Sequence, residues 1–92
     1  MNIEEIKPRL KEMIVERLTL DISPDEIKDD APLFSDENDG LNLDSVEALE
    51  IVVGIEQNFE VTVEEGDYKQ EFYSINTLSQ FVNGLRDQQP TP

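Results

Sequence analysis

The sequence predicts a small all-α protein, in which helices form a bundle around one hydrophobic core. Three segments place apolar residues at helical spacing, over 3–18, 46–59 and 75–85. A residue that commonly caps a helix precedes each of them. Ninety-two residues suffice for one core but not for two. We therefore expect one domain over residues 1–86 and a disordered tail over 87–92.

The first helix is expected from about residue 3 to 18. Asn2 and Glu5 have the spacing of a capping box, in which each side chain satisfies a backbone N–H of the first turn. Pro8 interrupts this pattern, because proline removes a helical hydrogen bond and restricts the residue before it. Two interpretations stay open: a kink in the first turn, or a regular helix that begins near Lys7.

A long loop is expected between the first two major helices. Ser23-Pro24-Asp25-Glu26 predicts a short helical turn that reaches residue 27 or 28. Residues 29–42 then lack periodicity, and their apolar side chains should attach the loop to the core: Leu33, Phe34, Leu41 and the following Leu43. Long loops without secondary structure are usually functional.

The acidic loop does not fit a calcium-binding EF-hand. With Gly40 as the sixth loop position, Ser35 would be first and Val46 twelfth, where the motif needs an acidic ligand. We therefore predict no metal site, and leave loose association of divalent ions with the carboxylates open.

Leu43-Asp44-Ser45-Val46-Glu47 predicts the start of the second major helix, which should run to about residue 58. Asp44 and Glu47 have the spacing of a capping box, with Asp44 as the N-cap. The Ser45 hydroxyl is then exposed at a helix N-terminus, where a phosphate group is favourably placed. On these residues alone, simple capping is the commoner role of Asp44 and Ser45.

One face of this helix should be core and the opposite face solvent-exposed. The expected core residues share one helical stripe: Ala48, Ile51, Val52, Ile55 and Phe59. Glu47 and Glu50 lie outside it, together with Val46 and Val53. Acidic residues beside exposed apolar ones indicate a docking surface for proteins, and an ordinary solvated helix face is the alternative.

The remaining chain should complete the bundle. Val61-Thr62-Val63 alternates like a strand but has no partner strand, so it is expected to be an extended connection that buries one or both valines. A short third helix is expected over 65–72, weakened by Gly66, and Ser74 should cap the last helix.

The charge distribution excludes several classes of ligand. The chain has 22 acidic and seven basic residues, and no basic residue lies between Lys28 and Lys69. Such a field repels nucleic acids and anionic membranes and attracts basic protein surfaces. No apolar run is long enough to span a membrane. Because the chain has neither histidine nor cysteine, we predict no catalytic residues.

The sequence resembles the acyl carrier protein family over essentially its whole length. Asn42-Leu43-Asp44-Ser45-Val46 is similar to the family's Gly-x-Asp-Ser-Leu motif. The continuation to Val52 and Phe59 resembles the family's second helix, and residues 74–78 resemble its fourth. Two departures, Asn42 for glycine and Val46 for leucine, suggest a specialised carrier; asparagine tolerates the left-handed backbone that a glycine allows.

The resemblance implies a four-helix bundle of three longer helices and a short third one, with the long loop between helices I and II. It implies a 4′-phosphopantetheine on Ser45, with Asp44 beside it, installed by a phosphopantetheinyl transferase. Acyl chains would travel on the arm as thioesters to acyl-transferring or acyl-modifying enzymes with basic surfaces. These enzymes would recognise Val46, Glu47, Glu50 and Val53, and the carrier would be a cytoplasmic monomer in fatty acid or related biosynthesis.

Two alternatives remain at this point. One is a freestanding peptidyl or aminoacyl carrier protein, which shares the serine and the arm but differs in cargo. The other is an acidic helical adaptor without a prosthetic group.

Overall fold

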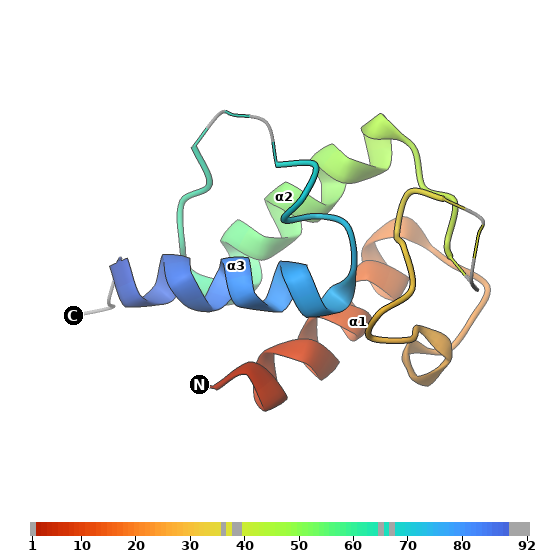
Figure 1. Ribbon diagram of the computed structural model, residues 1–92, viewed down its shortest axis with the longest axis horizontal. Helices are drawn as coiled ribbons and strands as arrows, with labels where there is room; N and C mark the ends of the chain where they lie inside the picture. The colour runs from red at the N-terminus through yellow and green to blue at the C-terminus, as the bar shows by residue number, and fades with distance from the viewer. Residues whose placement is uncertain (1, 36, 38–39, 65, 67, 89–92) are drawn as a thin grey trace.

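Three α-helices and one short 3₁₀ turn surround a single core in the computed structural model, which describes residues 2–35, 37, 40–64, 66 and 68–88 (Figure 1). In chain order they are α1 (Ile3–Leu18), η1 (Pro24–Glu26), α2 (Ser45–Phe59) and α3 (Ile75–Gln88). Helix α1 packs against both α2 and α3, which touch each other less. No strand occurs in the described residues, and the predicted all-α fold is confirmed.

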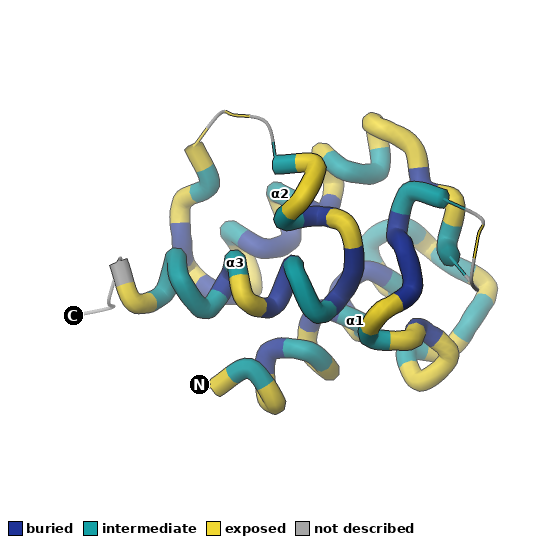
Figure 2. The backbone as a smooth tube through the Cα atoms, in the orientation of Figure 1, coloured by how far each residue is buried: buried dark blue, intermediate teal, exposed yellow. Residues whose placement is uncertain are grey.

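The core is built from the inward faces of the three helices and from the two long connections (Figure 2). Helices α1 and α2 contribute four buried residues each, at the spacing of one helical stripe. The predicted core stripe of α2 is confirmed at Ile51, Ile55 and Phe59, whereas Ala48 and Val52 are only half-buried. These two side chains line a pocket instead.

Helix α1 begins at Ile3 and contains Pro8, so the alternative of a start near Lys7 is wrong. The Asn2 side chain accepts a hydrogen bond from the Glu5 N–H at 3.0 Å, which gives the first turn a cap. The helix ends at Leu18, followed by Thr19 in the left-handed conformation, with φ of 53°.

The long loop is attached to the core as predicted, because Leu33 and Leu43 are buried and Phe34 and Leu41 pack against the core. Backbone hydrogen bonds fix its path: the Leu33 N–H donates to the Tyr73 carbonyl at 2.8 Å, and the Leu43 N–H donates to the Leu33 carbonyl at 2.9 Å. Leu33 is thus hydrogen-bonded to Tyr73, which lies 40 residues later in the sequence, and to Leu43, which lies two residues before α2 begins.

Two details of the loop refine the prediction. The Ser23 N–H donates to the Glu26 carboxylate at 2.7 Å, and the resulting turn ends at Glu26, slightly before the predicted residue 27 or 28. At Gly40 an added Cβ would lie 1.9 Å from the Ser35 carbonyl oxygen, so the chain passes itself too closely for any side chain.

The predicted short third helix is not formed in the described residues between α2 and α3, and this expectation is wrong. Residues 68–73 make turns, including one helical hydrogen bond from the Phe72 N–H to the Tyr68 carbonyl at 2.8 Å. Residues 65 and 67 of the predicted helix lie outside the described residues. One isolated turn fixes several dihedral angles for a single hydrogen bond, and Gly66 raises the entropy cost of extending it.

The segments on either side of this turn agree with the prediction. Val61 is buried and Val63 half-buried in an extended connection. The Ser74 hydroxyl accepts from the Thr77 N–H at 3.3 Å, and the Thr77 hydroxyl accepts from the Ser74 N–H at 2.9 Å, which caps α3. Helix α3 includes residues 87 and 88, beyond the predicted domain limit at 86; the rest of the predicted tail, 89–92, lies outside the described residues.

Candidate functional site

A complete capping box begins α2. The Asp44 carboxylate accepts from the Glu47 N–H at 3.0 Å, and the Glu47 carboxylate accepts from the Asp44 N–H at 3.0 Å. Asn42 has a φ of 54°, the left-handed backbone that asparagine tolerates. Leu43 between them is buried, so the loop is fixed to the core one residue before the cap.

Ser45 is the first residue of α2 and is exposed. Within the described part of the chain, the structure gives its hydroxyl no hydrogen-bond partner. The N–H groups of the first helical turn and the helix dipole produce positive potential at this position. A phosphodiester on the Ser45 oxygen would therefore be accessible to a modifying enzyme and electrostatically tolerated.

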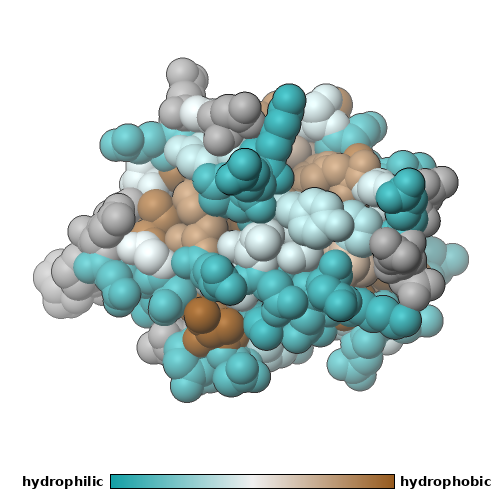
Figure 3. Space-filling model, in the orientation of Figure 1, coloured by the Kyte–Doolittle hydropathy of each residue, from teal (hydrophilic) through white to brown (hydrophobic). Residues whose placement is uncertain are grey.

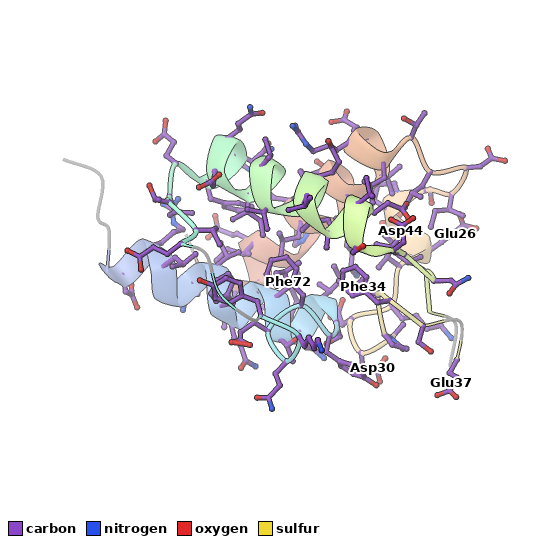
Figure 4. The ribbon with its side chains drawn as sticks, turned by 90° about the horizontal axis from the view of Figure 1, so that it is seen from above. Glu26, Asp30, Phe34, Glu37, Asp44 and Phe72 are labelled. Carbon is purple, nitrogen blue, oxygen red and sulfur yellow. The ribbon has the colours of Figure 1, made fainter. Side chains whose placement is uncertain are left out.

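A pocket of about 560 Å³ lies against α2, on the face of the helix that also carries Ser45. Its wall on α2 is Ala48, Leu49 and Val52, which follow Ser45 at i+3, i+4 and i+7 and so share its face of the helix. The opposite wall comes from the loop before α2 and from the segment before α3, including Phe34 and Phe72, which lie along one side of α2 (Figure 4).

An exposed apolar strip adjoins this pocket on the outer side of α2. Val46 is 67% exposed, Leu49 68% and Val53 36%. Elsewhere on the surface, patches of apolar side chains lie between mostly polar ones on the face that Figure 3 shows. The structure thus exposes Val46 and Val53, the two apolar residues predicted for a docking surface.

Leu49 was missed by the sequence reasoning, although it belongs to both the pocket and the exposed strip. The position of Leu49 in the sequence indicated that it lies on this part of the helix surface. Leu49 follows Ser45 by four residues and Val46 by three, so it had to lie between the serine and the predicted docking residues on the helix surface.

The two glutamates predicted for docking are already engaged within the protein. Glu47 caps the helix through Asp44, and the Glu50 carboxylate lies 3.1 Å from the Arg17 guanidinium of α1. Arg17 also donates to the Gln57 amide oxygen at 3.2 Å. Arg17 of the neighbouring helix therefore partly neutralises the negative charge of Glu50. The sequence alone did not predict this ion pair, because Arg17 and Glu50 are 33 residues apart.

The described residues contain no group of three or more acidic side chains arranged to hold a metal ion. Part of the acidic loop, residues 36, 38 and 39, lies outside them. No helix in the described part of the chain is both long and apolar enough to cross a membrane.

Comparison with known proteins gives one family. A family model described as a phosphopantetheine attachment site matches residues 8–83. An acyl carrier protein of Petrotoga mobilis is 32% identical over 87 residues, which cover 95% of this chain and 91% of that protein. One from Campylobacter fetus is 27% identical over 84% of this chain and 91% of its own, and one from Bdellovibrio bacteriovorus is 34% identical over 67% and 72% respectively.

Proposed function

This chain belongs to the acyl carrier protein family, whose members are carriers of 4′-phosphopantetheine and not enzymes, and we propose that Ser45 is the residue that holds this arm. The exposed hydroxyl at the start of α2, beside an apolar pocket on the same helical face, supports the assignment most strongly. When bound, the arm would supply a thiol that carries acyl groups as thioesters.

The surroundings of Ser45 suit such a group. Its hydroxyl needs no base in this chain, because a separate transferase would activate it. The Asp44 carboxylate is held by the Glu47 N–H, so it is turned to the helix backbone while the first-turn N–H groups offset the added charge. A rigid cap presents the serine in one orientation to visiting enzymes.

The pocket would shelter the acyl cargo from water. Its volume lies within the usual range for small-molecule sites, and apolar and aromatic side chains dominate its lining. Its α2 wall continues from Ser45 along one face of the helix, so a chain attached there can reach it. We propose that acyl chains of fatty acid or related specialised biosynthesis shelter there, in a cytoplasmic carrier.

Partner enzymes would recognise the outer side of α2. Val46, Leu49 and Val53 offer apolar contact beside Ser45, and Glu47 and Glu50 add negative charge that attracts Lys or Arg. A phosphopantetheinyl transferase and the acyl-transferring enzymes would both read this strip, because all of them must reach the same serine.

The attachment is tested by intact mass after incubation with coenzyme A and a broad-specificity phosphopantetheinyl transferase. We expect one phosphopantetheine per chain and none on Ser45→Ala. Ser23→Ala is the matched control, because Ser23 is also exposed and lies next to the start of a helical turn. Modification that persists in Ser45→Ala would refute the assignment, and a wild-type protein that several transferases leave unmodified would favour an adaptor without a prosthetic group.

The role of the exposed apolar strip in docking is tested with the same transferase reaction, whose rate is measured at increasing concentrations of the carrier protein. Val46→Ser should raise the KM for the carrier, because it removes apolar contact without touching the capping box. Gln80→Ala, at an exposed position on α3, should leave the KM unchanged.

The mass of the loaded protein isolated from its own cells would distinguish an acyl cargo from an aminoacyl one.

A further inference from the structure

The pocket beside Ser45 has two unlike walls. Aliphatic side chains of α2 form one wall, whereas the other holds four of the chain's six aromatic residues: Phe34, Tyr68, Phe72 and Tyr73. They come from two segments far apart in the sequence, 32–35 and 68–73. The fold thus concentrates most of its rings on one side of one pocket.

The aromatic wall is held in place before any cargo enters. The Tyr68 ring stacks against Phe72 at 6.0 Å between centroids and contacts Phe81 at 5.0 Å, while Phe72 and Phe81 are 5.9 Å apart. The Tyr68 hydroxyl donates to the Glu64 carbonyl. The Leu33 N–H donates to the Tyr73 carbonyl, which joins the two segments of the wall. The ring contacts preorganise Tyr68 and Phe72 and reduce the entropy lost on binding.

The lining contains no carboxylate among the described residues, although the chain is strongly acidic. The lining is mostly apolar, with Ser35 and Lys69 as its polar side chains besides the tyrosines. A cargo that is hydrated along its whole length would therefore lose more hydrogen bonds to water than these groups can replace. Aromatic faces and edges attract other π-systems in offset or edge-to-face arrangements, beyond the effect of buried area. A saturated chain gains only the free energy of burying its apolar surface area.

We infer that the pocket selects planar acyl groups, with an aromatic ring or a conjugated chain, over saturated acyl groups of the same size. The inference rests on the proposed attachment of the arm to Ser45 and adds the chemical class of its cargo. Each aromatic pair made by the cargo should favour the sheltered state by about two- to tenfold.

The test loads the full chain with a matched pair of acyl groups, 3-phenylpropanoyl and 3-cyclohexylpropanoyl, each transferred with its phosphopantetheine from the coenzyme A thioester. Cleavage of each thioester by hydroxylamine is measured relative to the same acyl group on free pantetheine, which cancels intrinsic reactivity. We expect the phenyl cargo to be protected two- to tenfold more than the cyclohexyl cargo. NMR contacts between its ring protons and Phe34 or Tyr73 should accompany the protection.

Variants locate the source of the preference. The double change Phe34→Leu with Tyr73→Leu should weaken it, because it removes two of the four lining rings and leaves Tyr68 and Phe72. Phe81→Leu should weaken it less, since Phe81 packs against Tyr68 and Phe72 without lining the pocket. Should the double variant fail to fold by circular dichroism, Tyr73→Leu alone decides, because that side chain is 53% exposed.

Equal protection of the two cargoes, stronger protection of the cyclohexyl cargo, or a preference that is undiminished when lining rings are removed would overturn the inference. Failure of either cargo to attach at Ser45, read from intact mass, would instead refute the proposed function. The two failures are therefore distinguishable in one experiment.

Discussion

Helices α1 and α2 have nearly the same length, 16 and 15 residues, and each buries four residues in the core, yet their outward faces differ. Four of the seven basic residues lie on α1, whereas α2 has none. Three of the four large apolar residues exposed in the described chain lie on α2, and none lies on α1. Burial thus follows the same physics in both helices, and of the two only α2 exposes large apolar side chains to solvent.

The largest expected effects lie on the inward faces, where the two helices should behave alike. Ile14→Ala in α1 and Ile55→Ala in α2 each remove a fully buried side chain and should lower the unfolding free energy by about 2–5 kcal/mol. Val46→Ala, on the outward face of α2, should change it by less than about 0.5 kcal/mol. Urea unfolding measures all three. A large loss at Val46 would mean that the exposed strip is structural.

The contact between the two helices is the next place to disturb. A Cβ at Gly54 would lie 2.3 Å from the Met13 sulfur and 3.1 Å from the Arg17 Cδ, so Gly54→Ala forces α1 side chains to move and should cost about 1–3 kcal/mol. Gly84→Ala in α3 is the matched control, because nothing lies within 4 Å of its Cβ. It should stabilise the protein by about 0.4–1 kcal/mol, as thermal unfolding would show.

The helix starts should also differ. Asp44→Ala removes the N-cap of a reciprocal box and should cost about 0.5–2 kcal/mol, while Asp44→Asn should retain most of the stability. Asn2→Ala removes the side-chain cap of the first turn of α1 and should cost less than Asp44→Ala. Equal losses at the two positions would show that the two helix starts contribute alike to stability.

The smallest effect concerns the charges of α1. Lys11 and Lys7 lie 2.6 and 3.3 Å from the Asp29 carboxylate, and the hydrogen bond from Lys11 is the main reason that the pKa of Asp29 falls below its ordinary value of 3.8. A lowered pKa stabilises the fold above the unfolded pKa, and this contribution is lost as the pH falls through the folded pKa.

Asp29→Asn should therefore lower stability at pH 7 by less than about 1 kcal/mol, because the carboxylate is 42% exposed and solvent screens the pair. The difference from wild type should shrink as the pH falls below about 4. Asp30→Asn, which removes a carboxylate at the exposed neighbouring position, is the matched control and should lower stability at pH 7 less than Asp29→Asn does. A constant difference across pH would assign the loss to packing instead of charge.

Local sequence signals were sufficient wherever one turn of chain supplies both partners of an interaction. Residues three or four positions apart form the Asp44 and Glu47 box, the cap at Ser74 and the inward stripe of α2, and the left-handed backbone at position 42 depends on Asn42 itself. The predicted helix over 65–72 failed because a single turn needs tertiary support to extend, and here aromatic packing against Phe81 holds the segment in turns.

Sequence by itself determined the helical class, the start of α2, the acidic field and the family resemblance centred on Ser45, since these depend on local order and composition. Tertiary structure alone decided that Arg17 of α1 reaches Glu50 of α2, that Leu33 is joined to Tyr73, and that four rings face one pocket. The physical reason is distance along the chain: contacts between segments 33 or more residues apart form only when the whole core brings those segments together.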